Sequence, residues 1–480
     1  MEERKNAPRL GENKMGVMPV GKLLFNMALP LAISMLVQAF YNIVDTYFVS
    51  LVSTDATGAL SIAFPVQNIQ IGFATGIAVG VNSLLSKSLG EGNRDKANRA
   101  AGNGIFLMLL FASMIMLFGI FGTKGYYSLF SVNDTTREFG ISYTTICCTF
   151  GLGIFVEVLG ERLLQASGRT IYTMFTQGTG AILNIILDPL FIMGSAGLES
   201  RLGIHLPFDF PAFGVAGAAI ATVIGQWVAA IMAVIFNLTK NHDVKFGIRY
   251  LKPDLAIIKK ILTVGVPSII MMTIGSIMNF CMNQIFLSFH DTYGQTPANV
   301  FGIYFKLQSM FLMPLFGINN ASISIIAYNY GARQPKRITG TLKCAVVTAL
   351  TIMIIGCGIF QFFPDKLMGL FGSSGDENAA ALVKMVITAM RIVSIHFPIA
   401  AIGIALCASF QAMGIGIYST FTSICRQLLA LVPVAYLLSL TGSVDAVWWA
   451  FPIAELVSLM ATLFFFRRIY KNKIKPLFVA

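Results

Sequence analysis

The sequence predicts an all-α membrane protein with twelve transmembrane helices in two pseudo-symmetric six-helix lobes. Three observations support this fold class: the composition, a series of long apolar runs and an internal repeat. Of the 480 residues, 56% are hydrophobic and 12% are charged, which leaves too little polar surface for a soluble protein of this size. A helix needs roughly 20 apolar residues to cross the hydrocarbon, and runs of that kind recur along nearly the whole chain.

The apolar runs are continuous, which favours a helical bundle over the alternating pattern of a membrane β-barrel. The first run is too long and too poorly bounded for a cleavable signal peptide, so we expect it to be a retained span. The twelve expected spans are 23–50, 57–85, 100–123, 138–163, 170–194, 214–239, 261–289, 298–329, 340–363, 382–411, 416–440 and 445–467.

The positive charges indicate how the helices are oriented. The net charge is +12, and most Lys and Arg residues lie in the two tails and the even-numbered links. Only Lys124, Arg137, Arg201 and Lys366 lie in odd-numbered links. The positive-inside rule therefore places both termini in the cytoplasm, as an even number of spans also requires. We expect a multi-pass protein of the bacterial cytoplasmic (inner) membrane, with basic residues that set topology and bind no nucleic acid.

Matching residues in the two halves indicate an internal repeat. Pro30 and Pro267 open the first and seventh spans, and Gly76 and Gly90 of the second span match Gly317 and Gly331 of the eighth. Because six spans separate the copies, both insert the same way round, and a cleft between the lobes is the expected substrate path. The predicted organisation is a tail (1–22), an N-lobe (23–240), a link (241–260), a C-lobe (261–467) and a second tail (468–480).

Acidic residues inside the spans are the first candidates for function, because each costs roughly 3 kcal/mol at mid-membrane on insertion scales. They are Asp45, Glu157, Glu161, Asp188 and Glu455. Asp45 shares a helix face with Gln38 and Asn42, and Asn184 lies one turn from Asp188. Carboxylates and amides at similar depth suit a coupling ion, either Na⁺ held by oxygen ligands or a proton on a carboxylate. The second half has no acids at the equivalent positions, so we expect ion coupling in the N-lobe.

Structural roles are the alternative for each acid. Asp45 would form an ordinary interhelical hydrogen bond, and the Asp188–Pro189 pair would terminate a helix. Glu161 lies beside Arg162 near the cytoplasmic end, where a long side chain reaches the interface easily, and Glu455 has no evident polar companion. The C-lobe instead carries basic residues that we expect to be buried, namely Lys306, Arg391, His396 and Arg426.

The chain resembles the multidrug and toxic compound extrusion (MATE) family, in its MepA-type branch, over about residues 22–470. The motifs that carry the resemblance are Pro30, Gln38 and 41–46 in the first span, 90–93 after the second, 165–168 after the fourth, 184–189 in the fifth and 217–222 in the sixth. The resemblance implies a V-shaped two-lobe fold, alternating access and efflux driven by H⁺ or Na⁺. It also implies a cation site at Asp45, Asn184, Asp188 and Thr222, with Gln38 beside it. The chain departs from the family at Gln165 and Arg169, and it has Glu161 where an Asn is usual.

The predicted function is secondary active multidrug efflux, with lipophilic organic cations exported in exchange for H⁺ or Na⁺. Tyr41, Glu161, Asn279 and Lys306 are the candidate residues of the substrate cavity. We expect a monomer in the lipid bilayer whose other partners are small cationic drugs, with no cofactor and no metal beyond Na⁺ at Asp45 and Asp188.

Two alternatives remain at this stage. A lipid-linked precursor flippase of the same superfamily would favour a cavity rich in Arg and Lys. A membrane-embedded enzyme would require clustered catalytic groups, whereas the four histidines, His205, His242, His290 and His396, are scattered along the chain.

Overall fold

The fold is taken from a computed structural model that describes residues 13–205, 207, 209–289, 294, 296–369 and 377–478. All regular structure in these ranges is helical. The first half contains α1 (Lys14–Val17), α2 (Val20–Ser50), α3 (Thr54–Gly90), α4 (Arg94–Leu117), α5 (Thr123–Ser128), α6 (Asp134–Thr149), α7 (Leu152–Ala166), α8 (Thr170–Leu202) and α9 (Gly214–Lys240). The second contains α10 (Leu255–Leu287), α12 (Thr296–Gly331), α13 (Pro335–Phe362), α14 (Pro364–Gly369), α15 (Glu377–Ser394), α16 (Phe397–Ala412), α17 (Gly416–Ile424), α18 (Val432–Ser439), α19 (Val444–Trp448) and α20 (Ala450–Ile469).

The described helices account for the twelve expected spans. Ten are long and apolar enough to cross a membrane singly, and two bent pairs bring the total to 12 if each pair is one span. The pairs are α6 with α7, bent by 46°, and α15 with α16, bent by 49°. The sequence predicted single spans at 138–163 and 382–411, which these pairs match when each counts as one span, but it did not predict the breaks. Gly151 and Gly153 lie at the first break, and Pro398, which has no N–H to donate, lies in the first turn of α16.

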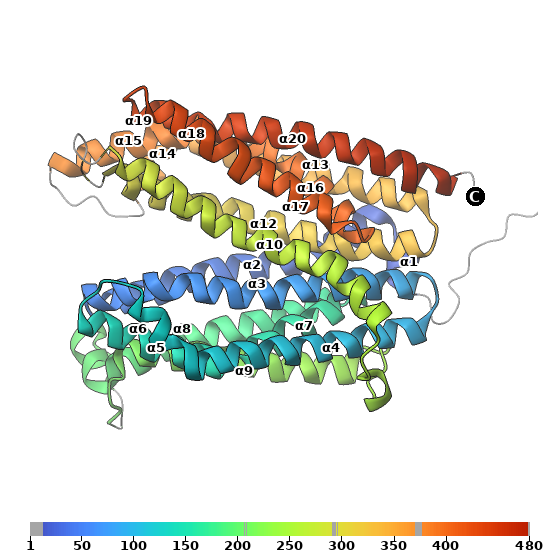
Figure 1. The fold of residues 1–480 in the computed structure, drawn as a ribbon, viewed down its shortest axis with the longest axis horizontal. Helices are drawn as coiled ribbons and strands as arrows, with labels where there is room; N and C mark the ends of the chain where they lie inside the picture. The colour runs from blue at the N-terminus through green and yellow to red at the C-terminus, as the bar shows by residue number, and fades with distance from the viewer. Residues whose placement is uncertain are drawn as a thin grey trace, which may run out of the picture.

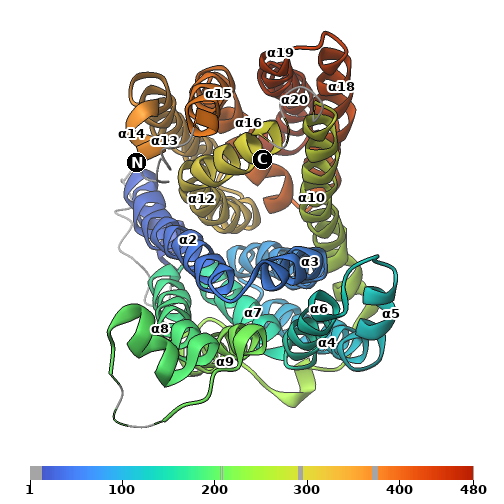
Figure 2. The same cartoon turned by 90° about the vertical axis from the view of Figure 1, so that its left-hand side faces the viewer.

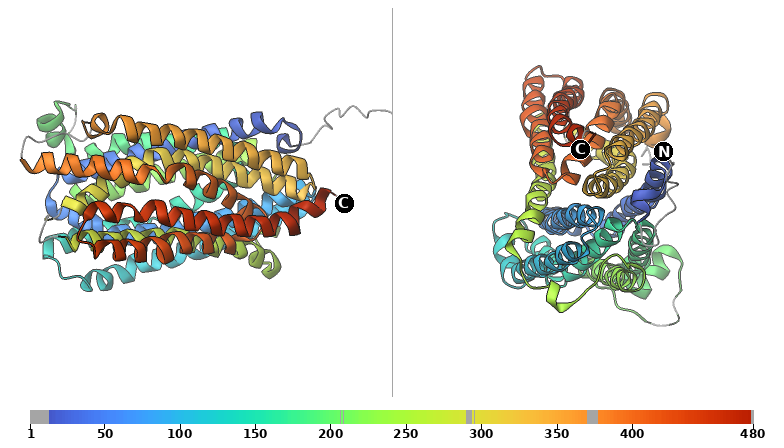
Figure 3. Two further views of the ribbon diagram at one scale, coloured as in Figure 1. Left: turned by 90° about the horizontal axis from the view of Figure 1, so that it is seen from above. Right: turned by 90° about the vertical axis from the view of Figure 1, so that its right-hand side faces the viewer.

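The helices form two lobes (Figure 1), which meet where α2 and α3 pack against α10 and α12. Seen from one end, α2 and α3 lie between the rest of the first lobe and α12, while α10 runs alongside α3 (Figure 2). α1 and the end of α20 lie at the same end of the bundle (Figures 1 and 3), as an even number of spans requires. The residue boundaries of the lobes and tails stay as predicted above.

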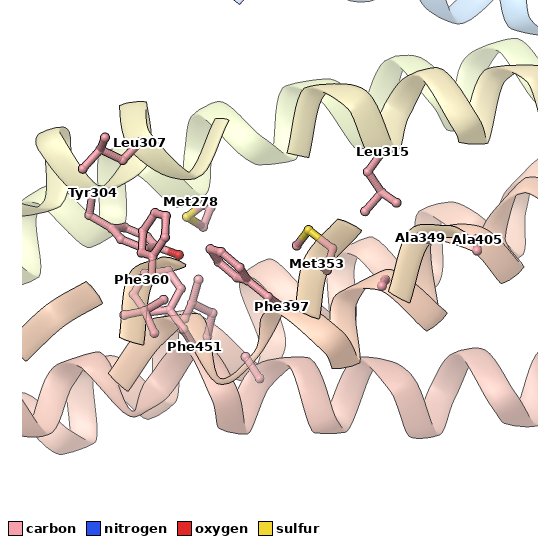
Figure 4. Close-up of a cluster of buried hydrophobic side chains, with 14 of the residues drawn as sticks. Met278, Tyr304, Leu307, Leu315, Ala349, Met353, Phe360, Phe397, Ala405 and Phe451 are labelled. Carbon is pink, nitrogen blue, oxygen red and sulfur yellow. The ribbon is translucent and has the colours of Figure 1, made fainter. Parts of the chain in front are cut away.

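The C-lobe has an aromatic core. Tyr304 of α12, Phe360 of α13, Phe397 of α16 and Phe451 of α20 converge near one end of the lobe (Figure 4). The ring centroids of Phe360 and Phe397 are 5.2 Å apart in an edge-on arrangement, which favours aromatic pairs beyond their buried area. This packing holds the bent α15–α16 span in place.

Reciprocal glycine contacts join the lobes and confirm the internal repeat. Gly90 lies against the carbonyl of Tyr328, and Gly331, its repeat equivalent, lies against the carbonyl of Lys87. A Cβ at either glycine would collide with backbone, so only glycine permits this approach of α3 to α12. The same exchange relates Gly76, which packs on α10, to Gly317, which packs on α2.

Side-chain hydrogen bonds reinforce the same interface. Ser324 Oγ donates to Asn82 Oδ1 at 3.0 Å, and Ser83 Oγ donates to the carbonyl of Gln411 at 2.7 Å. These bonds lie toward the ends of α3 and α12 that are nearest to α1. The lobes are therefore closed against each other at that end of the bundle.

The short helix α1 bridges the two lobes at this closed end. Asn13 Nδ2 donates to the carbonyl of Ser167 at 3.0 Å in the first lobe. Arg337 Nη2 of the second lobe donates to the carbonyls of Met15 at 2.9 Å and Met18 at 2.7 Å. Asn329 Nδ2 also donates to the Met15 carbonyl, at 3.1 Å, and the Met15 side chain is fully buried.

Candidate cation site in the N-lobe

Three residues predicted for ion coupling form one buried cluster between α8 and α9. With the Asn184 amide in the orientation that satisfies its neighbours, its nitrogen donates to Asp188 Oδ2 at 2.7 Å and its oxygen accepts from the Thr222 N–H at 3.1 Å. Asp188 is 0% exposed, and Asn184 and Thr222 are also buried. Gly180 and Gly225 allow α8 and α9 to pack closely beside this cluster, because each lies against the other's carbonyl. The contact brings the α8 carboxylate against α9.

Asp45 of α2 adds a second carboxylate to this region. Its Oδ1 atom is buried and has no hydrogen-bond partner, and its charge acts on Asp188. Within the described ranges neither Asp45 nor Asp188 forms an ion pair with Lys, Arg or His. A buried carboxylate beside a half-buried one, with no basic partner for either, is unfavourable unless a cation neutralises them. The donor set of two carboxylates, an amide and a hydroxyl suits Na⁺ or a proton.

Phenol groups line the same cluster. The Tyr41 hydroxyl interacts with Thr222 and faces the carboxylates of Asp45 and Asp188. Tyr143 of α6 is 2% exposed and lies close enough to Asp45 to interact with its charge. The Tyr143 hydroxyl accepts a hydrogen bond from Gln67 Nε2 at 2.9 Å. Sequence reasoning placed Tyr41 with the substrate and did not single out Tyr143. A tyrosine whose hydroxyl lies within an apolar span was the available signal.

Other predicted site residues lie elsewhere. Gln38 is exposed, and the side chain of Asn42 lies outside the described part of the chain. Asn279 is half-buried and donates to the carbonyl of Gly275 in its own helix at 3.0 Å. The structure therefore does not bring Gln38 or Asn279 into the Asp45–Asp188 cluster.

Two expectations about charged residues in the C-lobe were wrong. Lys306 and Arg391 are exposed rather than buried, because sequence position alone does not give the rotation of a helix toward its neighbours. Glu455 does have a polar companion, since Arg426 Nη1 lies 3.8 Å from its Oε2. Arg426 lies in a π-helical segment (Cys425–Leu431) whose register a regular helical period does not predict.

Glu161 was also misplaced by the sequence interpretation. It is 3% exposed and does not reach the interface. Instead it accepts from Thr176 Oγ1 and Gln177 Nε2, both at 2.8 Å. Both donors come from α8, the next helix in the chain.

Comparison with known proteins identifies the family. A family model described as MatE matches residues 30–190 and 267–437. The chain belongs to the MatE family. The two matched segments fall in the two lobes, and the resemblance noted in the sequence is confirmed.

Relatives of this MatE protein carry transporter names. It is 23% identical over 444 residues to the multidrug export protein MepA of Staphylococcus haemolyticus, covering 92% of each chain. It is 24% identical over 454 residues to an FAD transporter of Shewanella oneidensis, covering 94% of this chain and 95% of the relative. The MatE protein is thus a multi-pass membrane transporter and not an enzyme.

Solved structures confirm the two-lobe fold. A multidrug resistance MATE family transporter of the MOP superfamily in an outward-facing conformation superposes with a TM-score of 0.87 at 23% identity, covering 99% of this chain and all of the other. A MATE protein in complex with MaL6 also gives 0.87, at 24% identity, covering 97% of this chain and 99% of that chain. At these identities the likeness establishes the fold alone.

Proposed function

We propose that this MatE protein exports lipophilic organic cations in exchange for H⁺ or Na⁺ bound at the Asp45–Asp188 cluster. The observation that carries the proposal is the pair formed by the buried Asp188 and the half-buried Asp45, which has no basic partner among the described residues and includes one buried oxygen without a hydrogen-bond partner. Such a pair attracts a small cation or a cationic drug, and occupancy by one removes the charge that attracts the other. Both lobes and the path between them belong to one chain, so a monomer suffices.

The named relatives offer two substrate classes. Multidrug export by MepA agrees with an acidic N-lobe cluster, whereas FAD carries an anionic diphosphate that these carboxylates would repel. The charge of the cluster therefore favours cations. A flippase for lipid-linked anions is disfavoured for the same reason, because the exposed Lys306 is not part of the cluster.

We expect drug and coupling ion to weaken each other's binding by the same factor, because linkage between two ligands is reciprocal at equilibrium. Neutralising both carboxylates should lower ethidium affinity by about 5- to 150-fold, the usual range for such coupling. Ethidium fluorescence titrations of the purified protein, across pH and across Na⁺ concentration, measure this directly. A matched titration with FAD tests the anionic alternative.

The Asp45→Asn/Asp188→Asn variant is the control for these titrations, since its ethidium affinity should no longer respond to either ion. If the ethidium affinity of transport-competent wild-type protein did not change with pH or Na⁺ concentration, these carboxylates would not couple ion binding to drug binding. Transport of FAD without transport of ethidium would contradict the proposal that the substrates are organic cations.

We also propose that both ends of the chain face the cytoplasm of a bacterial inner membrane. The basic links and the shared end of α1 and α20 support this orientation. A fluorescent protein fused after residue 478 should fold and fluoresce, because it stays in the cytoplasm. High activity of alkaline phosphatase fused at the same point would reverse the orientation, since that enzyme matures only outside the cytoplasm.

A further inference from the structure

A second acidic pair, the half-buried Glu157 and the buried Glu161, lies on the cytoplasmic side of the Asp45–Asp188 cluster. Glu157 and Glu161 stand one turn apart on α7, and the charge of Glu161 acts on Glu157. Glu161 accepts from Thr176 and Gln177 of α8, both at 2.8 Å. Two hydrogen bonds to one carboxylate favour its charged form.

The charges here do not balance. Arg162 is 6% exposed and neighbours Glu161, yet its Nη1 donates to Gln165 Oε1 at 2.9 Å. Among the described residues it forms no ion pair within 4.0 Å of a carboxylate. The charged groups that act on one another here are two carboxylates and one guanidinium, all of α7. The helices packed against α7, namely α3, α4, α8, α9 and α12, add no charged group that acts on either carboxylate in the described part of the chain. When both carboxylates are ionised, one negative charge is left inside the lobe, and burying it without a bound cation or proton is costly.

Unpartnered oxygens point to what neutralises this charge. Gln177 Oε1 and Thr173 Oγ1 are both buried without a hydrogen-bond partner, and Thr173 is 0% exposed. They stand one turn apart on α8, on the face that carries the donors to Glu161. An amide oxygen can only accept, so beside carboxylates it requires a donor or a cation.

The position of these residues relates them to the first cluster. Thr173, Gln177, Asn184 and Asp188 follow one another along α8 at spacings of four, seven and four residues, so they share one helix face. Gln177 lies two turns from Asn184, roughly 10.5 Å along the axis, on the side of the cytoplasmic end. Only Gly180 and Ala181 occupy that face between them. The small residues leave little side-chain bulk along the row.

We propose that Glu157, Glu161, Thr173 and Gln177 form a second site for the coupling cation, which the ion occupies between the Asp45–Asp188 cluster and the cytoplasm. The inference rests on the proposed function, because it takes the ligand to be the ion exchanged for drug. It assigns the buried Glu161 to the ion rather than to the substrate cavity. Na⁺ would be held by carboxylate, amide and hydroxyl oxygens, and a proton would be held by the carboxylate pair.

The test measures cation binding to the full-length purified protein in nanodiscs. One arm uses radioactive Na⁺ alone, and the other measures proton uptake with a pH indicator between mildly alkaline and mildly acidic pH. We expect Asp45→Asn/Asp188→Asn to retain binding in one arm and the further change Glu161→Gln to abolish it. Glu138→Gln, at an exposed glutamate of α6, is the matched control and should change neither arm.

Two milder variants identify the ion and guard against misfolding. Thr173→Ala and Gln177→Met remove an unpartnered oxygen but no charge, so each should weaken Na⁺ binding about tenfold if Na⁺ is the ligand. If the ligand is a proton, Thr173→Ala should leave proton uptake unchanged. Gln177→Met should move uptake to higher pH, because it also removes the Nε2 donor that favours the charged form of Glu161.

The outcomes separate the two proposals. The second site would be ruled out if adding Glu161→Gln to the double variant left its cation binding unchanged in both arms. No residual binding in the double variant would overturn it too. If wild type and the double variant bound the cation equally, Asp45 and Asp188 would not form a cation site. The effect of Glu161→Gln would then still decide whether the second site exists.

Discussion

Asp45→Asn should abolish ion-driven export of ethidium while leaving the protein folded and inserted in the membrane. Asparagine keeps the shape of the side chain but cannot bind a proton or carry the charge that Na⁺ neutralises. The buried Oδ1 atom of Asp45 has no hydrogen-bond partner, so the change breaks no bond at that oxygen. A loss of roughly tenfold or more in rate, about 1.4 kcal/mol, is the minimum expected for removing a coupling group.

The measurement uses proteoliposomes with the pH gradient and the Na⁺ gradient imposed separately. Asp209→Asn is the matched control, since it makes the same chemical change at an exposed loop residue of the same lobe. Asp188→Asn should also impair export, but less, because Asn184 still donates a hydrogen bond to position 188. Normal ion-driven export by folded Asp45→Asn protein would show that this carboxylate does not couple transport.

Gly90→Val should prevent the lobes from closing at the end of the bundle nearest to α1 and thereby stop transport. The new Cβ would collide with the carbonyl of Tyr328, and that backbone has no free rotation with which to yield. Overpacking costs typically about 1–3 kcal/mol, which shifts the equilibrium roughly 5- to 150-fold toward states in which α3 and α12 separate. Gly331→Val should act alike, because its Cβ would meet the carbonyl of Lys87.

Spin-label distances between the ends of α3 and α12 nearest to α1 report this shift, and they should lengthen in both variants. Gly302→Val is the control on α12, where an added Cβ meets nothing within 4 Å. Unchanged distances together with normal export would mean that the glycine contact is not needed for closure.

The sequence predicts the fold of this protein well because its signals act within single helices. Apolar runs of sufficient length give the spans, and the matched glycines give the repeat that Gly90 and Gly331 display as contacts. Asn184 and Asp188 are close because they lie one turn apart on α8. Their approach to Thr222 of α9 followed from family resemblance, since no spacing within one helix reports it.

The parts that the sequence did not predict depend on how neighbouring helices are rotated and broken. Glu161 and its donors lie on successive helices, and their contact requires the two faces to meet. The pairing of Arg426 with Glu455 crosses from a π-helical segment to α20. Helical periodicity fixes which residues share a face, but packing decides whether that face stays exposed, as at Lys306, or meets another helix.

The bridge formed by α1 also affects the kinetics of the transport cycle. Asn13 bonds to one lobe, while the carbonyls of Met15 and Met18 accept from Arg337 of the other. Any movement that opens this end of the bundle has to break one of these sets of bonds or carry α1 away with a single lobe. Part of the activation barrier for reorientation is therefore located in a four-residue helix outside the membrane spans. Turnover is consequently sensitive to whatever is fused immediately before Asn13, even when both ligand sites are intact.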